Sequence, residues 1–465
     1  MSTRKSIPGP RGYPLLGSLP ALARQPFPFL VGMAQQYGGI VRLPLGPARV
    51  YLVSHPAYVR QILVTNAANY GKGPILRGIK LIIGEGLFAS EGALWRRQRQ
   101  LLAPTFSHQR LRGMVPVMTD VIGAHLALWE ARVARGAVVD LLDEMGLINI
   151  NILLATIFGT SISAAEARRI RAASDVLFEH SEKLVFSFFV PLSIPRPGHR
   201  RFQRALAVVN QLVSQVIADR RRELRDTGDL LSTLLLARDE GTGAAMDDRQ
   251  IRDEVMSILL AGYESTAAAL AWTWALLAQH PAVEARLQAE LQAVLGGRIP
   301  TAEDVPQLRY TRQVIDETLR LYPPFPTFFR TAQAADHLGG YALPANAALI
   351  LSPYVTHRHP AYWADPERFD PQRFAPDRRA GLPRDAYYPF GMGQRLCIGS
   401  GLSVLEQQLI IAMVAQQYAR RLTPGYVMEP HYDIALRPRH GVPMILTPQR
   451  SADTQNLGSA PGGGA

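Results

Sequence analysis

The chain has 465 residues, 47% of them hydrophobic, and is long enough to bury a large core. Its single cysteine, Cys397, excludes internal disulfides and zinc sites built on cysteine pairs. The formal net charge is +12, but the arginines are scattered in twos and threes without interleaved aromatic residues, which argues against nucleic acid as a partner.

The N-terminus, MSTRKSIPGPRGYPLLG, lacks the apolar core of a signal peptide. No run reaches the roughly 18 apolar residues that span a bilayer, so we expect a cytoplasmic protein without a transmembrane anchor. The prolines of residues 1–20 predict an extended strap across the surface, because proline lacks the amide donor that a helix needs. The next stretch, GGIVRLPLGPARVYLVS, predicts two short strands joined by a turn at Gly46-Pro47.

Helical periodicity dominates the rest of the chain, with amphipathic patterns at 114–135, 164–180, 200–225 and 283–295 and an apolar, buried helix at 255–270. The apolar, proline-rich segment 186–201 predicts either a lid or an ordinary helix connection. A closing strand is expected at 442–447, and the Gly/Ser/Ala-rich tail 449–465 is expected to be disordered. No repeat or composition shift marks a second domain, so residues 1–448 should form one domain.

The surroundings of Cys397 are unusual for a lone cysteine, which is most often a small buried hydrophobic residue. Its stretch, PFGMGQRLCIGSG, contains the spacing Phe-Gly-x-Gly-x-Arg-x-Cys-x-Gly directly ahead of an apolar helical pattern. Glycines permit a tight turn that approaches a flat ligand closely. Backbone amides of such a turn, together with the start of the next helix, favour the thiolate over the thiol. The stretch resembles the signature of the cytochrome P-450 family.

This resemblance implies a mainly α, helix-rich single domain with small β-sheets near both termini. It also implies a haem whose axial ligand is the Cys397 thiolate, which favours O–O cleavage by pushing electron density toward the iron. By the same resemblance, Phe390 packs beside the sulfur, Arg395 pairs with a haem propionate, and Gly399 completes the cofactor-binding loop. The chain has no Cys-x-x-Cys-His, so haem b (iron protoporphyrin IX) should be held non-covalently.

Two further motifs match scaffold signatures of the family. Glu317-Thr-Leu-Arg320 places an acid and a base on one helical face. Downstream, Pro366-Glu-Arg-Phe369 supplies Arg368, which the resemblance places with Glu317 and Arg320 in a buried triad beneath the cysteine loop. We expect haem loss if one of the three is removed, because a buried charge would lose its partner.

The stretch LLAGYEST lies within the predicted buried helix. A glycine there costs about 1 kcal/mol relative to alanine, and it is explained either by close helix packing or, by resemblance, by a groove above the iron that Ala261-Gly262 opens. Glu264 followed by an alcohol resembles the pair that relays protons to oxygen, and a carboxylate in an apolar helix needs such a reason. The family usually has threonine directly after the acid. Here Ser265 holds that position and Thr266 follows. Because the two side chains point about 100° apart on a helix, Ser265 is favoured by its position and Thr266 is the reserve candidate.

Other carried-over sites lie outside these motifs. Trp95 and Arg99 match a Trp-x-x-x-Arg that contacts a haem propionate, and Arg330 is expected at the other propionate. The substrate pocket is expected to contain mostly apolar residues, namely Phe88, Phe189, Ala261 and Thr327. A terpenoid or other polycyclic hydrocarbon is favoured as substrate. A fatty acid is the alternative, with Arg49 and Tyr51 as possible anchors unless they form a solvated strand face.

The resemblance implies a monooxygenase that inserts one atom of O2 into a hydrophobic small molecule, by hydroxylation or epoxidation. The family pattern covers nearly the whole chain, so electrons should come from a separate ferredoxin and ferredoxin reductase. Arg96 and Arg97 are expected either to bind the acidic ferredoxin or to belong to a generally basic surface. The protein is expected to be a monomer. The alternatives are a peroxygenase or isomerase and, in another class, a non-catalytic haem gas sensor or carrier.

Overall fold

The computed structural model describes residues 5–46, 48–73, 76–186, 197–223, 228–238, 245–432 and 435–449. The helices in chain order are α1 (Leu19–Arg24), α2 (Pro26–Tyr37), α3 (Pro56–Arg60), α4 (Arg77–Ile83), α5 (Gly92–Leu102), α6 (His108–Ala134), α7 (Leu141–Ile157), α8 (Ala164–Phe186), α9 (His199–Glu223), α10 (Leu230–Leu236), α11 (Asp248–Gln279), α12 (Pro281–Leu295), α13 (Arg309–Leu321), α14 (Pro353–Thr356), α15 (Pro376–Arg379) and α16 (Ser400–Gln417).

The strands are β1 (Ile40–Leu45), β2 (Ala48–Val53), β3 (Tyr70–Gly71), β4 (Val138–Asp140), β5 (Phe328–Ala332), β6 (Asp336–Leu338), β7 (Tyr341–Leu343), β8 (Ala348–Leu351), β9 (Tyr418–Leu422), β10 (Pro430–Tyr432), β11 (Leu436–Pro438) and β12 (Pro443–Pro448). They form a five-stranded sheet in the order β1-β2-β8-β5-β3, a three-stranded sheet β4-β12-β9, and two hairpins, β6-β7 and β10-β11.

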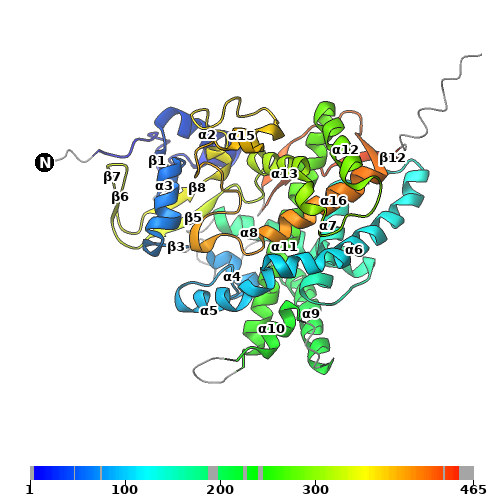
Figure 1. Ribbon diagram of the computed structural model, residues 1–465. Helices are drawn as coiled ribbons and strands as arrows, with labels where there is room; N and C mark the ends of the chain where they lie inside the picture. The colour runs from blue at the N-terminus through cyan, green and yellow to red at the C-terminus, as the bar shows by residue number, and fades with distance from the viewer. Residues whose placement is uncertain are drawn as a thin grey trace, which may run out of the picture.

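Helix α11 is the centre of the structure. Its first turn is capped by Asp247, whose carboxylate accepts a hydrogen bond from the amide of Gln250 at 2.7 Å. The helix then packs against α7, α13 and α16 and is buried along most of its length. Figure 1 shows α11 running through the helical part of the molecule, with α16 beside it. The loop before α16 carries Cys397, so α11 and this loop border the same interior region.

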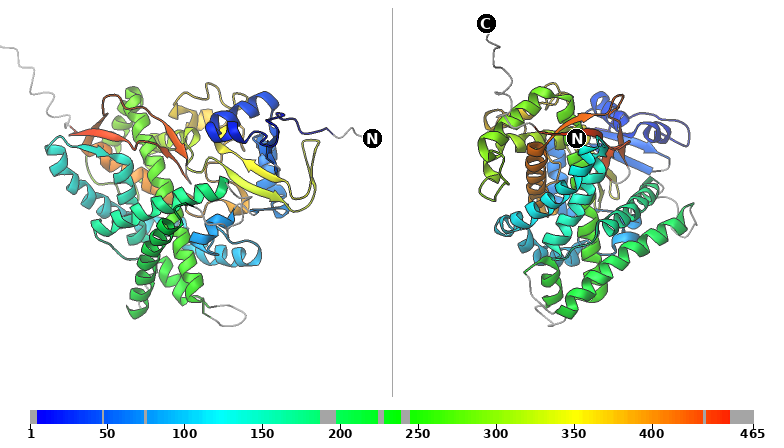
Figure 2. Two further views of the ribbon diagram at one scale, coloured as in Figure 1. Left: turned by 180° about the vertical axis from the view of Figure 1, so that it is seen from behind. Right: turned by 90° about the vertical axis from the view of Figure 1, so that its right-hand side faces the viewer.

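The five-stranded sheet lies at the other side of the molecule, where α1 and α2 cover one of its faces (Figure 2). Apolar residues of β1, β2 and β8 form a separate core cluster with Leu22 and Leu30 of these two helices. Strand β5 lies between β8 and β3 and directly follows Thr327. Strands β1 and β2 belong to the same sheet as β5. Through β5, this sheet reaches the interior region that lies between α11 and the cysteine loop.

The fold prediction is confirmed: the chain is mainly helical, with small sheets near both ends of the chain. The two predicted strands are β1 and β2, the predicted closing strand is β12, and the helical patterns correspond to α6, α8, α9, α11 and α12. The five-stranded sheet also takes in β5 and β8 from the middle of the chain, which periodicity did not indicate. Most of the proposed lid segment and nearly all of the tail lie outside the described residues.

Two helices, α6 and α11, are long and apolar enough to cross a membrane when judged by length and composition alone. In α11, 83% of the most apolar window is buried inside the protein, whereas the figure is 33% in α6. A helix in the core of a folded domain passes the same test, so this is weak support for a membrane span.

Candidate active site

The loop that carries Cys397 is held by its own backbone. The amide of Cys397 donates a hydrogen bond of 3.0 Å to the carbonyl oxygen of Phe390. Gly391 and Gly393 adopt φ angles of 76° and 68°, which favour glycine. A Cβ on Gly393 would lie 2.2 Å from the carbonyl oxygen of Leu63, so only glycine fits this close approach. The predicted tight turn is therefore present, and Phe390 contributes its carbonyl oxygen to it.

The thiol of Cys397 is subject to opposing influences. Burial raises its pKa, while the amide of Gly399 and the charge of Arg99 act to lower it. The charge of Arg99 comes from α5, so a positively charged residue of another element lies near the sulfur and favours the thiolate that a metal-ligating cysteine requires.

Four cations lie near the cysteine loop, and among the described residues few carboxylates act on them. Burial and the charges of Arg395 and Arg330 lower the pKa of Lys72 to about 7. Burial and Arg330 likewise lower the pKa of Arg395 to about 10. Glu91 is the acid that acts on this group, and Arg99 is the fourth cation. Such a cluster fits the two propionates of a haem whose iron meets the cysteine.

The predicted propionate-binding residues come from separate elements. Trp95 on α5 is buried, and its ring lies under the guanidinium of Arg395, with 3.7 Å from Cζ to the ring centroid. Arg395 also donates to the carbonyl oxygen of Ser90 at 3.0 Å. Arg330 on β5 donates to the carbonyl oxygen of its neighbour Phe329. The structure thus gathers Trp95, Arg330 and Arg395 near the cysteine loop, and adds Lys72, which sequence reasoning missed.

The prediction of the buried scaffold triad is wrong for one residue, Arg368. The guanidinium of Arg320 binds Glu317 through two hydrogen bonds of 2.7 and 2.8 Å, and both side chains are fully buried. The second arginine on Glu317 is Arg373, with 3.3 Å between Nε and Oε1. Arg368, the predicted partner, is exposed and offers only its backbone carbonyl oxygen to Arg320.

The physical reason lies in the short segment between the two arginines. Arg373 belongs to a 3₁₀ helix, Pro371–Phe374, that packs against α13. The start of this helix turns the side chain of Arg373 inward, whereas Arg368 precedes it in an exposed turn. The stretch DPERFDPQRF contains two Arg-Phe pairs five residues apart. The sequence pattern predicts the first pair, whereas the second pair supplies the buried arginine.

The buried ion pair is linked to the cysteine loop through a histidine. Arg320 donates to the carbonyl oxygen of His357 at 2.8 Å, and the ring Nε2 of His357 accepts from the amide of Tyr388 at 3.0 Å. Burial and the nearby Arg320 hold the pKa of His357 well below its usual value, so the ring is neutral and can accept. Tyr388 precedes Phe390 by two residues. The scaffold residues therefore fix the start of the loop that ends in Cys397.

The middle of α11 has one face that is less buried than the rest. Ala261, Gly262 and Ser265 are partly exposed, while the residues around them are buried. Ser265 donates its hydroxyl to the carbonyl oxygen of Ala261 at 2.8 Å. Gly262 also has a packing role, because a Cβ there would lie 2.9 Å from Leu153 of α7. Both explanations of the glycine, a groove and close helix packing, therefore agree with the structure.

Asn149 of α7 was missed by sequence reasoning. Its amide donates to the carbonyl oxygens of Gly262 and Tyr263 at 3.2 and 2.7 Å, which are helix carbonyls next to the partly exposed face. The signal was an asparagine within the apolar pattern of residues 141–157, where an amide needs a specific partner.

The side chains of Glu264 and Thr266 contact different neighbours. Oε1 of Glu264 lies 3.7 Å from Nη1 of Arg437, which also binds Asp175 at 3.0 Å. Thr266 is buried, and its hydroxyl lies 2.9 Å from that of Ser403 on α16. Of the two candidate hydroxyls, only that of Ser265 lies on the partly exposed face of α11.

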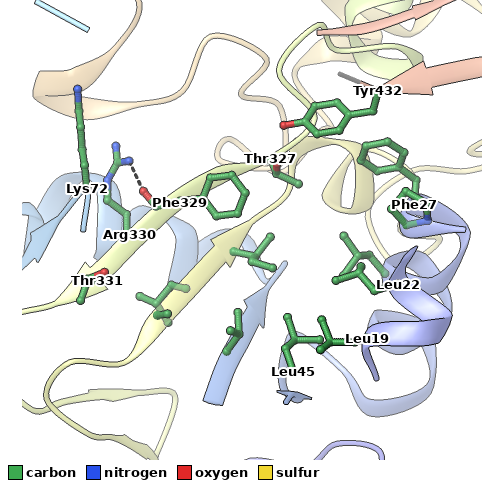
Figure 3. A pocket seen from close by; sticks show the side chains of 16 residues that line it. Leu19, Leu22, Phe27, Leu45, Lys72, Thr327, Phe329, Arg330, Thr331 and Tyr432 are labelled. Carbon is green, nitrogen blue, oxygen red and sulfur yellow. Dashed lines mark hydrogen bonds between the residues drawn. The ribbon is translucent and has the colours of Figure 1, made fainter. Parts of the chain in front are cut away.

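Apolar side chains adjoin the cation cluster, where Nζ of Lys72 lies 5.3 Å from the centroid of the Phe88 ring. The rings of Phe88 and Phe325 have centroids 6.3 Å apart. A cavity that is open to solvent extends from Thr327 and Arg330 along the sheet toward α1 and α2 (Figure 3). Its lining is apolar apart from a few residues, among them Lys72, and Phe329 points into it. Phe189 lies outside the described residues.

Comparison with known proteins decides the family. The family model described as Cytochrome P450 (cytochrome P-450) matches residues 7–441. The chain belongs to the cytochrome P-450 family. A crystal structure of a cytochrome P-450 haem domain superposes with a TM-score of 0.87 at 28% identity, covering 96% of this chain and 98% of that one. The enzyme is thus a cytochrome P-450 monooxygenase, an oxidoreductase that incorporates molecular oxygen. Its family requires a haem with a cysteine thiolate ligand.

Curated relatives of this cytochrome P-450 include bacterial enzymes. Cyclooctat-9-en-7-ol 5-monooxygenase and cyclooctatin synthase of Streptomyces melanosporofaciens are each 38% identical, over 90% and 92% of this chain and the same shares of their own lengths. Pentalenene oxygenase of Streptomyces avermitilis is 32% identical, over 90% of this chain and 92% of its own length. Membership of the family also implies dioxygen, a hydrophobic substrate and a redox partner.

Proposed function

We propose that this cytochrome P-450 hydroxylates or epoxidises a terpenoid, a cyclic hydrocarbon skeleton with few polar groups. The observation that carries the proposal is the similarity over nearly the whole chain to two cyclooctatin enzymes and to pentalenene oxygenase. The apolar character of Phe88, Phe325 and the adjoining cavity supports it, because such a lining selects ligands by shape.

Bound haem supplies the iron that activates dioxygen. Within the proposal it is haem b held without covalent bonds, because the chain has no second cysteine for attachment. Cys397 provides the thiolate, with Gly399 and Arg99 favouring its charged form. Arg99, Arg330, Arg395 and Lys72 hold the propionates by charge-assisted hydrogen bonds.

On the oxygen side, we assign the relay alcohol to Ser265. It lies on the partly exposed face of α11, whereas Thr266 is bound to Ser403 in the interior. Glu264 is the acid that supplies protons, and its contact with Arg437, which also binds Asp175, connects it to the middle of α8.

Electrons come, in this proposal, from a ferredoxin and its reductase in the cytoplasm. Arg96 and Arg97 are exposed on α5, the helix whose Arg99 acts on Cys397. An acidic ferredoxin bound there would lie on the cysteine side of the haem. The chain is proposed to work as a monomer.

The test of the substrate class is a spectral titration of the haem-loaded protein. Cyclic sesquiterpene and diterpene hydrocarbons should displace the iron-bound water and shift the spin state, whereas linear fatty acids of equal carbon number should not. A shift with fatty acids alone would overturn the terpenoid assignment in favour of a fatty-acid hydroxylase. The two residues considered as fatty-acid anchors do not support that alternative, since Arg49 is exposed and Tyr51 is buried in the sheet core.

A further inference from the structure

The short segment between α4 and α5, residues 85–91, holds two of the propionate-binding cations through its backbone. The carbonyl oxygen of Ser90 accepts a hydrogen bond of 3.0 Å from Nη1 of Arg395, and the carbonyl oxygen of Phe88 accepts one from Nζ of Lys72. We call residues 85–91 the bridging segment. Any shift of its backbone moves the groups that hold both cations.

The bridging segment is fixed to α11 by two adjacent carboxylates. Asp253 accepts a hydrogen bond from the amide of Glu85, and Glu254 accepts one from the amide of Leu87, both at 2.9 Å. The contact is close, because a Cβ on Gly86 would lie 2.2 Å from the carbonyl oxygen of Asp253. The position of the segment therefore depends on the side chains of these two acids.

Gln98 of α5 holds the same segment from another side. Its Nε2 donates to the carbonyl oxygen of Glu85 at 2.8 Å, and its Oε1 accepts a hydrogen bond from the hydroxyl of Ser90. Both Gln98 and Ser90 are buried. Trp95, whose ring lies under Arg395, precedes Gln98 by three residues on α5. Helices α5 and α11 thus hold the segment, and the segment holds the cations.

Glu254 is the member of this network that can change its charge. It is fully buried, and its Oε1 has no hydrogen-bond partner within the described residues. Burial and the charge of Asp253 raise the pKa of this carboxyl group, while the amide of Leu87 and the side chain of Gln98 act to lower it, and the resulting pKa is about 7. A proton can therefore bind at Oε1 near neutral pH without breaking the hydrogen bond that Oε2 accepts.

Other charged side chains of this region are engaged with one another. Arg252 binds Asp253 at 2.7 Å, and Lys80 of α4 binds Glu85 at 2.8 Å. Among the described residues, Asp253 is the charged group that acts on the pKa of the buried glutamate. Burial and neighbouring arginines bring the pKa of Lys72 to about 7 as well, so a test of pH dependence has to separate the glutamate from this lysine.

We propose that Glu254 is a positioning residue for the haem, which acts through the bridging segment on Lys72 and Arg395 and takes up a proton when the iron is reduced. The iron gains one electron from the redox partner, and the carboxylate gains one proton from solvent at Oε1. No bond to a substrate forms or breaks in this step. The inference rests on the proposed propionate contacts of the two cations but not on the terpenoid substrate.

Two physical effects couple the proton to the electron. A buried negative charge opposes the addition of an electron to a nearby cofactor, so reduction increases the proton affinity of the carboxylate. Protonation also replaces the charge-assisted hydrogen bond to Leu87 by a neutral one that is about half as strong. The bridging segment then holds its two cations less firmly, and they can move toward the propionates. Gln250, one turn before Glu254, is half-exposed, so the proton has a short way from solvent.

The test measures the reduction midpoint potential of the haem-loaded full chain against pH, without substrate. In the parent, the potential should fall as the pH rises through about 7, because the charged carboxylate opposes reduction. Glu254→Gln keeps an acceptor for Leu87 and cannot ionise, so its potential should stay near the value of the parent at low pH. The matched control is Glu85→Gln, at a half-exposed acid of the same segment, which should keep the pH dependence.

Lys72→Gln separates the two groups that titrate near this pH. This variant should transfer haem to apomyoglobin roughly 5-fold faster than the parent, as expected for one lost hydrogen bond, and its potential should still depend on pH. A pH dependence that disappears in Lys72→Gln and persists in Glu254→Gln would overturn the proposal. An unchanged transfer rate in Lys72→Gln would instead refute the propionate contact, and the inference would fail with it.

Gln98→Leu tests the path through the bridging segment. Haem transfer should again be roughly 5-fold faster, because Ser90 loses a partner that fixes its carbonyl oxygen beside Arg395. The midpoint of the pH dependence should move to higher pH, because the side chain that lowers the pKa of Glu254 is lost. Gln100→Leu, at an exposed position of the same helix, is the control. Parent-like values of both quantities in Gln98→Leu would contradict the proposed path.

Discussion

Ser265 and Thr266 illustrate how two adjacent hydroxyls of one helix acquire different surroundings. Both follow Glu264, and the sequence offers no physical ground to choose between them beyond their order. In the structure, Thr266 is buried against Ser403 of α16, while Ser265 stays on the partly exposed face with its hydroxyl on the carbonyl oxygen of Ala261. Packing of α11 on α16 is what separates them.

The variant Ser265→Ala should therefore uncouple oxygen use from product formation. Without the hydroxyl, proton delivery on the groove side fails, and a several-fold larger share of the electrons should appear as hydrogen peroxide. Peroxide and product are measured per NADPH consumed in the reconstituted system. The control is Thr266→Ala, which should keep the coupling and lower the free energy of unfolding by about 1 kcal/mol through the lost hydrogen bond. Uncoupling in Thr266→Ala alone would reverse the assignment.

Glu254 is a second informative residue. Its carboxylate accepts the amide of Leu87 at 2.9 Å and thereby holds the loop that carries Phe88. Burial raises its pKa from 4.5 to about 7. The folded state therefore binds this proton more tightly than the unfolded state, so stability falls as the pH rises from about 4.5 to about 7, and the full penalty is present above that range.

Glu254→Gln should remove this pH dependence and keep the acceptor for Leu87. At a pH one unit above the upper limit of this range, we expect the variant to exceed the parent in free energy of unfolding by up to about 3 kcal/mol. Near the lower limit, the two should be nearly equal. Urea unfolding at both pH values measures the difference. Glu303→Gln, at an exposed glutamate, is the control, and an equal change at both pH values would contradict the expectation.

Among the elements, α13 and the segment after β8 position the cysteine loop. The path runs from the buried pair Glu317–Arg320 to His357 and then to the amide of Tyr388. Because the Glu317–Arg320 pair is buried, removing either partner leaves the other charge unpaired in the protein interior, which is strongly destabilising. The loop therefore depends on residues that never contact the cofactor.

Arg373→Ala should cost about 3 kcal/mol of the free energy of unfolding, because Glu317 loses one of its two arginines in a buried site. We expect partial loss of haem as well. Arg368→Ala is the matched control, and it should change stability by no more than about 0.5 kcal/mol, since that side chain is exposed. The haem content of the purified protein and its urea unfolding measure the two effects. A larger loss of haem and stability in Arg368→Ala than in Arg373→Ala would restore Arg368 as the partner of Glu317.

The elements also show what the sequence could and could not predict. Motif spacing identified the cysteine loop, the Glu317–Arg320 pair and the buried helix, because each depends on contacts between near neighbours in the chain. Arg373, Asn149 and Lys72 depend on how distant segments pack. A choice between two similar Arg-Phe pairs needs the geometry of the turn between them, and the pairing of β5 with β8 needs contacts that periodicity does not encode.

On the scale of the whole molecule, charge is distributed unevenly. The N-terminal end holds most of the net positive charge, while the cysteine side presents Arg96 and Arg97 on the exposed face of α5. The ferredoxin belongs, in our proposal, to the region near α5.

Arg96→Glu should lower the rate of the first electron transfer from reduced ferredoxin at low ionic strength by about tenfold, since reversing one charge in a binding surface weakens steering. The effect should shrink as salt is added. Stopped-flow reduction under carbon monoxide measures the rate. Arg249→Glu, an exposed arginine at the start of α11, is the control and should leave the rate unchanged. Equal slowing in both variants would remove α5 from the docking surface.

The single cysteine of the chain has a practical consequence. Cys397 is the only thiol of the protein, and the cytochrome P-450 family requires a cysteine thiolate as the haem ligand. A thiolate bound to iron does not react with an alkylating reagent. Covalent labelling followed by intact mass measurement therefore counts the molecules that lack cofactor directly, one label per empty chain, without any assumption about an extinction coefficient.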